Sequence, residues 1–302
     1  MISVEWRDDE AGSYSSMRWS LLVLFALTAC GASGNRGISS QRTIFGAAVE
    51  GIERPHPDVL RLPIIAQIKG GPTLLTIRGN VSPREADRIA RTARATYRDV
   101  NRRFVPQKRP TKRAVDICVF ESNSEYRRFV RQMFEADAPF ALGFYMSSHR
   151  IVAADVSVGL GNLRHEMVHP LIKDAFPDLP DWLNEGLASL YGSARYRRGR
   201  YNFRVNYRLN HLIHARARGT APGFVDLALS DYDTVHGGRE RAFYAVGRYL
   251  LLYLEQRRRL VPFFRDMTSA KPTTSHQLNV LRRHARESSF WRWTRRIHSR
   301  WW

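Results

Sequence analysis

The segment His165-Glu166-Met167-Val168-His169 limits most tightly how this chain folds. Two histidines four positions apart lie on the same face, one turn from each other, only if the segment is helical. Both imidazoles can then bind one metal ion at a distance of about 2 Å. Apolar residues recur at helical spacing around them, which predicts a buried helix; they are Leu160, Leu163, Met167, Val168, Leu171 and Ile172.

Glu185 stands in a second apolar stretch, residues 182–191. A carboxylate among apolar neighbours costs free energy unless it is paired or bound to metal, so we predict Glu185 as the third ligand of a zinc ion held by His165 and His169. Glu166 then lies near the open metal position, where it can act as general base toward water. This pattern is typical of a zinc-dependent hydrolase. The alternative is two core histidines and a capping or salt-bridged glutamate.

The start of the chain has the features of an export signal. Arg18 precedes an apolar run at 21–27, and small residues follow it; the run is too short to span a bilayer, which needs about 20 residues. The sequence Leu27-Thr28-Ala29-Cys30 resembles the lipobox of bacterial lipoproteins, which implies that Cys30 becomes lipidated. An ordinary cleaved signal with Cys30 as a free thiol is the alternative. We expect residues 1–29 to be an upstream extension plus the signal, with Met17 as the true start.

The chain is strongly basic, with a formal net charge of +20. Such a field favours anionic neighbours. Because the basic residues are scattered rather than gathered in a nucleic-acid module, we expect contact with a membrane and no nucleic-acid partner. Cys118 is the other cysteine, so no disulfide framework is available once Cys30 is lipidated; its apolar surroundings predict a buried strand residue.

The pattern of the chain predicts an α+β fold: a small mixed β-sheet with the zinc-bearing active-site helix, followed by a mainly helical C-terminal part. We expect a flexible tether at 30–61, an α/β catalytic part at 62–200 and a helical part at 201–302. The expected strands are 73–77, 114–120, 142–146 and 150–154, the last two as a hairpin beside the zinc helix. Besides the two helices at the metal, helices are expected at 82–104, 122–134, 202–218, 240–257, 260–268, 274–287 and 289–301.

Residues 115–265 resemble the peptidase MA-like family of gluzincin metallopeptidases. The matching segments are Asp116-Ile117-Cys118-Val119-Phe120, Gly143-Phe144-Tyr145, His165 to His169, Pro180 to Ala188, and Phe243-Tyr244-Ala245-Val246-Gly247 through Glu255. The resemblance implies a zincin-like fold and peptide-bond hydrolysis, with His165, His169 and Glu185 as zinc ligands and Glu166 as general base. Gluzincins of the aminopeptidase type carry a similar Tyr-x-x-Gly-x-x-x-Leu helix, which implies that the Tyr244 hydroxyl stabilises the oxyanion. His236, Tyr232 or an ordinary half-buried Tyr244 are the alternatives.

Two residues depart from the family pattern. Pro170 follows the second histidine and removes a helical hydrogen bond to Glu166, so we expect a kink there. Ser189 stands where many gluzincins keep an acidic partner for a ligand, so either another group orients the site or the site binds metal less tightly. His211 and His214 resemble a metal pair but lack an acidic third ligand, which favours a surface helix. The aromatic, basic tail 290–302 is an amphipathic helix that either docks on the core or lies on a membrane.

Together these features predict an exported, lipid-anchored zinc peptidase of the bacterial cell envelope that acts on a peptide or protein substrate. A catalytically idle envelope binding protein that keeps the same scaffold is a second hypothesis. A third is a basic membrane- or nucleic-acid-binding protein in which the motif is accidental.

Overall fold

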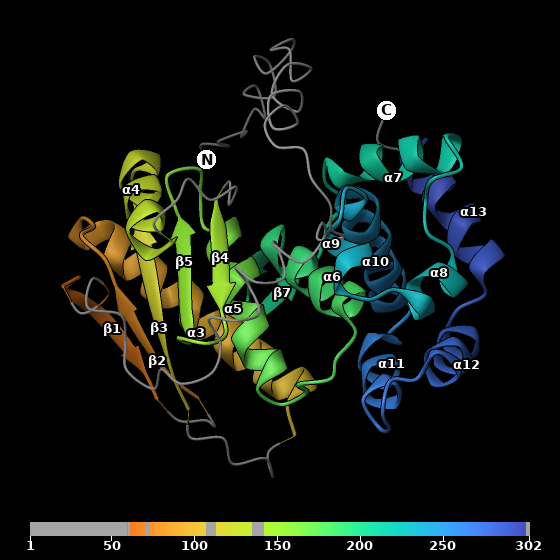
Figure 1. Ribbon diagram of the computed structural model, residues 1–302, viewed down its shortest axis with the longest axis horizontal. Coiled ribbons are helices and arrows are strands. Elements are labelled where there is room, and N and C mark those ends of the chain that lie inside the picture. Colours follow the sequence, from red (N-terminus) through yellow and green to blue (C-terminus); the bar gives the residue numbers. More distant parts are fainter. Residues whose placement is uncertain (1–58, 60, 70–72, 107–112, 135–141, 300–302) are drawn as a thin grey trace, which may run out of the picture. The chain divides into compact units, whose positions relative to one another are not determined.

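A five-stranded mixed sheet forms the first part of the described chain (Figure 1). The computed structural model describes residues 59, 61–69, 73–106, 113–134 and 142–299. The strands are β1 (Ile64–Ile68), β2 (Thr73–Arg78), β3 (Arg113–Phe120), β4 (Gly143–Met146) and β5 (Ile151–Asp155), in the order β1-β2-β3-β5-β4. β2, β3 and β5 run parallel, and the edge strands β1 and β4 pair antiparallel with their neighbours.

Three helices cover this sheet on its two faces (Figure 1). They are α3 (Pro83–Phe104), α4 (Asn123–Phe134) and α5 (Gly161–Lys173). Side chains of β3 alternate between the faces: Ile117 and Val119 belong to the core shared with α3 and α5, whereas Cys118 and Phe120 belong to a smaller core under α4. Cys118 is fully buried, as its apolar surroundings predicted.

The second part of the chain is mainly helical, which confirms the predicted α+β fold. Its elements are α6 (Asp181–Gly192), the strands β6 (Arg195–Arg197) and β7 (Arg200–Asn202), α7 (Arg208–Ala217), α8 (Phe224–Leu229), α9 (Tyr232–His236), α10 (Glu240–Gln256), α11 (Leu260–Met267), α12 (Thr274–His284) and α13 (Glu287–His298). α10 packs against α6, α7, α9, α11 and α13 and is therefore the central helix of this part.

The C-terminal amphipathic helix docks on the protein's own core within the described residues. Phe290 and Trp293 of α13 are buried, and Trp293 packs edge-on against Tyr253 of α10 at 5.4 Å between ring centroids. Trp301 lies outside the described residues. Within the described part of the chain, none of the helices combines the length and the apolarity that a membrane span requires.

The predicted element pattern is mostly confirmed, with specific exceptions. The helix expected at 202–218 begins only at Arg208, because 200–202 pair as β7 with β6, a hairpin that we did not predict. β1, α8 and α9 were also missed. The predicted signal, the lipidation site Cys30 and the tether up to residue 58 lie outside the described residues, and the predicted boundaries of the parts remain predictions.

Candidate metal centre

The metal-site residues are brought together by two antiparallel helices, α5 and α6. At one end of the pair, the Arg164 guanidinium donates hydrogen bonds to the backbone carbonyls of Tyr191 (3.0 Å) and Gly192 (2.8 Å), the last residues of α6. At the other end, Lys173 Nζ lies 3.4 Å from Asp181 Oδ1. These contacts set the offset between the helices, so the histidine face of α5 lies against the middle of α6.

His165, His169 and Glu185 form a group that could hold one metal ion. One ligand atom from each lies within 4.8 Å of the other two. His165 Nε2 is 3.4 Å from Glu185 Oε2, and His169 Nε2 is 3.8 Å from Glu185 Oε1. Ligands about 2.1 Å from a tetrahedral zinc ion are separated by about 3.4 Å, so small side-chain movements would produce zinc geometry.

Unsatisfied atoms support the fit of this group to a metal. Glu185 is only 7% exposed, yet its Oε2 atom accepts no hydrogen bond of good geometry among the described residues. A buried carboxylate oxygen without a donor is unfavourable unless a cation satisfies it. Two neutral imidazoles and one carboxylate are a ligand set that zinc prefers.

The charges of the three groups depend on one another in the metal-free site. Burial by itself would raise the pKa of Glu185, but the neighbouring His169 and His165 lower it to about 2. Burial would lower the pKa of His165, but the nearby carboxylate of Glu185, 3.4 Å away, and the charge of Glu166 raise it. Burial lowers the pKa of His169 to about 4. The negative charge of Glu185 and the pull of the neighbouring carboxylates on His165 therefore favour a positive charge at this place, which a metal ion would supply.

Glu166 lies beside this group and under the edge strand β4. Its carboxylate is 3.8 Å from His169 Nε2. Burial raises the pKa of Glu166 to about 7, only partly opposed by the charge of His165. A Cβ atom at Gly143 of β4 would come within 2.8 Å of Glu166 Cγ, so the absence of a side chain there lets the strand pass directly over Glu166.

The structure also brings together the three candidates for oxyanion stabilisation. The Tyr244 hydroxyl is 3.0 Å from His236 Nδ1, and the Tyr232 ring stacks on His236 at 4.3 Å. Burial, followed by the negative charges of Glu185 and Glu166, raises the pKa of Tyr244 far above its usual value. Tyr244 therefore lies close to the metal group as a neutral hydroxyl.

Two residues near the centre were not predicted as functional. Asn184, next to Glu185 on α6, lies beside His169 and opposes the lowering of its pKa, although His169 Nδ1 and Asn184 Oδ1 do not reach good hydrogen-bond geometry. Its place directly before the ligand glutamate was the available signal. The Arg208 guanidinium lies 5.6 Å from the Tyr244 ring, and its charge acts on His165; nothing in the local sequence distinguished it from the many other arginines.

The two departures from the family pattern have simple structural outcomes. α5 continues through Pro170 to Lys173, and the kink expected at the proline stays a prediction. Ser189 is buried, and its hydroxyl has no partner among the described residues. His211 and His214 join no group of possible metal ligands in the described part of the chain.

No protein-family model matches this chain, and no curated protein matches it either. The chemistry of the centre must therefore be argued from its own residues.

Proposed function

We propose that this chain is a zinc-dependent peptidase of the gluzincin type. The observation that carries the proposal is the buried group of His165, His169 and Glu185, with their ligand atoms within 4.8 Å of one another and Glu166 directly beside them. These three residues would hold the ion. A bound zinc ion would supply Lewis-acid polarisation of a peptide carbonyl and acidify water.

Glu166 is the group that would move protons. Its carboxylate lies 3.8 Å from His169 Nε2, beside the place where the ion would be held, so it can accept a proton from attacking water and then release it to the leaving amine. Its buried position keeps this proton from exchanging freely with bulk water. Neither His165 nor His169 can serve as the base, because both are needed as ligands.

Tyr244 is suited to stabilise the oxyanion. If His236 carries its proton on Nδ1 and donates it to the Tyr244 oxygen, the tyrosine proton is free to point toward the substrate. A neutral hydroxyl in this place donates to the negative oxygen that develops as water attacks.

Strand β4 offers a surface for an extended peptide. It ends the sheet order and, among the described residues, pairs only with β5. Main-chain groups on its outer edge can bind a substrate strand by β-augmentation, and the passage of Gly143 over Glu166 would bring that substrate to the base. This supports peptides or proteins as the substrate class.

The signal-like start of the chain supports a place in the bacterial cell envelope. In this proposal Cys30 carries the lipid anchor, and the membrane is a partner through that anchor and the basic surface of the protein. Replacement of Cys30 by alanine should release the protein from the membrane fraction while leaving its metal content unchanged.

The central experiment compares wild type with Glu166→Gln and His169→Ala. Each purified protein is analysed for bound zinc and is then incubated with a mixture of unstructured peptides, with and without chelator. Wild type should hydrolyse peptides until chelator is added. Glu166→Gln should keep zinc but lose activity by a factor of at least about 100, and His169→Ala should lose both. Zinc binding without hydrolysis in wild type would favour an idle binding protein, and no zinc in wild type would refute the metal site.

A further inference from the structure

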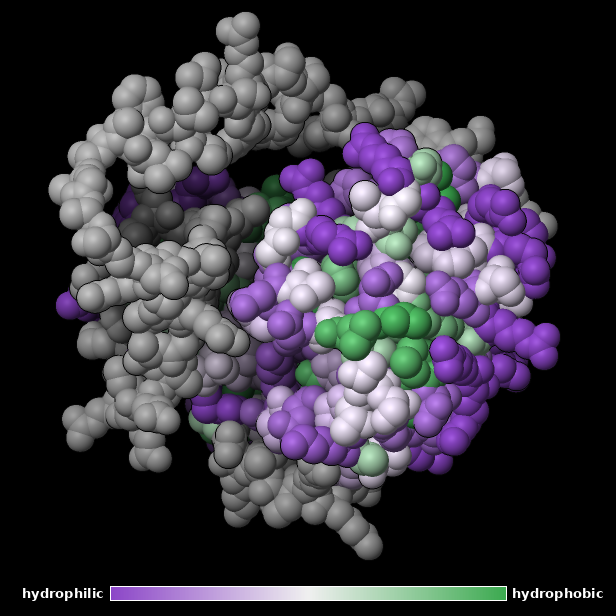
Figure 2. Space-filling view, turned by 45° about the vertical axis from the view of Figure 1, so that its right-hand side comes forward, coloured by the Kyte–Doolittle hydropathy of each residue, from purple (hydrophilic) through white to green (hydrophobic). Residues whose placement is uncertain are grey.

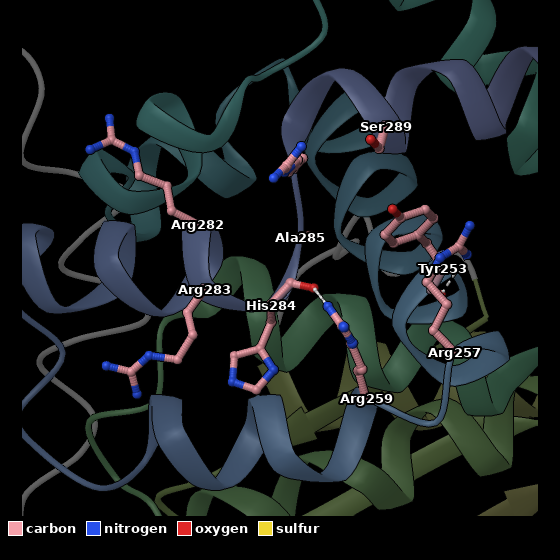
Figure 3. A pocket seen from close by; sticks show the side chains of 9 residues that line it. Tyr253, Arg257, Arg259, Arg282, Arg283, His284, Ala285 and Ser289 are labelled. Carbon is pink, nitrogen blue, oxygen red and sulfur yellow. Dashed lines mark hydrogen bonds between the residues drawn. The ribbon is translucent and has the colours of Figure 1, made fainter.

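The C-terminal helices form an open cavity of about 720 Å³ that is lined by arginines. The lining comes from the end of α10, the start of α11, the end of α12 and the start of α13 (Figure 3). A second cavity of about 510 Å³ continues along α13 and shares Tyr253, Arg257 and Ser289 with the first. Seven arginines line the two: Arg257, Arg259, Arg282, Arg283, Arg286, Arg292 and Arg296.

This arginine pocket is separate from the metal centre. None of the residues that line it belongs to the metal group or its neighbours. Tyr244 at the centre and Tyr253 at the pocket are nine residues apart on α10, which corresponds to about 14 Å along the helix axis. The pocket therefore needs an explanation of its own.

Carboxylates do not neutralise the positive charge of the pocket. Of the seven arginines only Arg283 forms an ion pair within the described residues, at 3.2 Å from Asp266, and His284 also contacts that carboxylate, at 2.8 Å. Glu255, the nearest carboxylate on α10, is paired with Arg103 on the side of α3. No aspartate or glutamate lines either cavity.

Several of the arginines are held in place without losing their charge. Arg257 lies over the Tyr253 ring, 3.6 Å from its centroid, and donates to the Tyr253 carbonyl. Arg259 donates to the carbonyl of His284 at 3.2 Å, which links the start of α11 to the end of α12 (Figure 3). Carbonyls orient a guanidinium but leave its formal charge intact, so an anion would still meet fixed cations.

The backbone of the turn between α10 and α11 also holds two of these arginines in place. Arg258 has φ +58, a left-handed conformation that a glycine adopts more easily. The amide of Arg258 bonds to the carbonyl of Glu255, and the amide of Arg259 bonds to that of Leu254, which completes a Schellman motif. This motif directs Arg257 and Arg259 to the same cavity.

The chemistry of the lining selects the kind of ligand. Arginine forks match phosphate oxygens in bidentate pairs, and several forks around one cavity favour a group with more than one negative charge. Two aromatic rings lie in the lining. Tyr253 is 5% exposed and covered by Arg257, and the His284 ring contacts Asp266 and packs edge-on against Phe263, so neither offers a free face on which a nucleic-acid base could stack. Figure 2 shows that hydrophilic residues cover much of the visible face of the helical part, with one small hydrophobic patch.

We propose that the arginine pocket binds a compact, multiply charged phosphate group, either free or as the headgroup of an anionic lipid. Arg257 and Arg259 would contribute an arrangement that exists before the ligand binds, and the arginines of the lining that have no carboxylate partner among the described residues would add to the affinity, whereas Arg283 is paired with Asp266. This site is independent of the proposed peptidase activity.

The test uses the full chain, a pocket variant and a matched control. The pocket variant is Arg257→Gln/Arg282→Gln/Arg286→Gln. The control variant is Arg84→Gln/Arg94→Gln/Arg98→Gln, which removes the same charge from exposed arginines of α3 that form no ion pair with another described residue. Calorimetry measures inorganic pyrophosphate binding, and flotation compares vesicles that contain phosphatidylglycerol with vesicles of phosphatidylcholine alone. Circular dichroism checks that all three proteins are folded.

Pyrophosphate binding that weakens about 100-fold in the pocket variant and less than about threefold in the control would support the site and identify free phosphate as a ligand. Failure of pyrophosphate to bind, with vesicle binding lost only in the pocket variant, would support it with a lipid headgroup as the source. Equal weakening in both variants, or no binding of either probe to wild type, would overturn the proposal. So would an oligonucleotide that binds more tightly than pyrophosphate and depends on the pocket.

Discussion

At the scale of single residues, burial sets the charge of Glu166 and makes the free energy of unfolding of the metal-free protein depend on pH. The pKa of this carboxyl is about 7 in the folded protein and about 4.5 when exposed. Between about pH 4.5 and pH 7, the folded protein therefore keeps a proton on Glu166 that the unfolded chain has lost. The stability that Glu166 contributes is present in full below about pH 4.5 and is lost as the pH rises through 7.

We predict that Glu166→Gln stabilises the metal-free protein at about pH 8, by about 3 kcal/mol more than at about pH 4. The opposite pH effect of His169, whose pKa is lowered, occurs in both proteins and cancels in the difference. Urea unfolding of both proteins in the presence of chelator provides the measurement. A stability difference that stays constant between the two pH values would show that Glu166 is not buried as described.

Tyr244 allows a second prediction at this scale. Tyr244→Phe removes only the hydroxyl, so the metal ligands and the packing of α10 stay unchanged. We expect kcat to fall by about 100- to 1000-fold, equivalent to about 3–4 kcal/mol of barrier stabilisation, with zinc content unaffected. His236→Ala should cost less, since it removes only the group that orients the hydroxyl. Full activity of Tyr244→Phe on the same peptides would exclude this role.

At the scale of elements, the metal centre depends on how closely α10 approaches α6. The two helices touch backbone to backbone at Gly186 and Gly247. A Cβ atom at Gly247 would lie 2.8 Å from the Trp182 carbonyl oxygen, and one at Gly186 would lie 2.9 Å from the Gly247 carbonyl carbon. Backbone atoms cannot move aside as a flexible side chain can, so a methyl group would separate the helices.

We predict that Gly247→Ala lowers the free energy of unfolding by about 1–3 kcal/mol and reduces activity without touching a ligand. The loss of activity follows because α10 carries Tyr244 one turn before this contact and α6 carries Glu185. Urea unfolding and peptide hydrolysis should be compared with Arg241→Ala, an exposed site on the same helix, which should behave as wild type. Wild-type stability of Gly247→Ala would mean that the helices are less tightly packed.

The elements also show which features the sequence could reveal. The sequence predicted α3, the β4–β5 hairpin and both helices of the candidate metal centre, because the signals of these elements are local. The β6–β7 hairpin was missed because its turn uses Arg198, at φ 51, before Gly199 at φ 78. This pair of left-handed residues is usually marked by Asn-Gly, which is a stronger signal.

The metal group was predictable and its surroundings were not. The three possible ligands, His165, His169 and Glu185, lie in two short segments. The residue spacing in these segments is enough to predict that the three side chains meet. The position of Arg208 near Tyr244 and the formation of the arginine pocket depend on how helices distant in sequence pack together. Because the chain has many arginines, residue type alone does not distinguish these from the others. Long-range packing of this kind has no local signature.

At the scale of the whole molecule, the metal centre joins the two parts of the chain. α5 packs on the sheet through β3, β4 and β5, and α6 packs on α10, the central helix of the second part. An ion bound by His165, His169 and Glu185 would therefore tie the sheet to the helical part through a single point. Without the ion, α5 and α6 are joined here by the 3.4 Å contact between His165 Nε2 and Glu185 Oε2.

We predict that zinc removal lowers the thermal midpoint of the whole protein in one cooperative transition. A ligand at about 1000 times its Kd stabilises the folded state by about 4 kcal/mol, which corresponds to about 10 °C for a chain of this size. Calorimetry with and without chelator provides the measurement. Glu166→Gln should show the same shift because it keeps the ligands, whereas His165→Ala should unfold at the chelated temperature under both conditions. A shift confined to one of two separate transitions would contradict the link between the parts, because it would show that the ion stabilises only one of them.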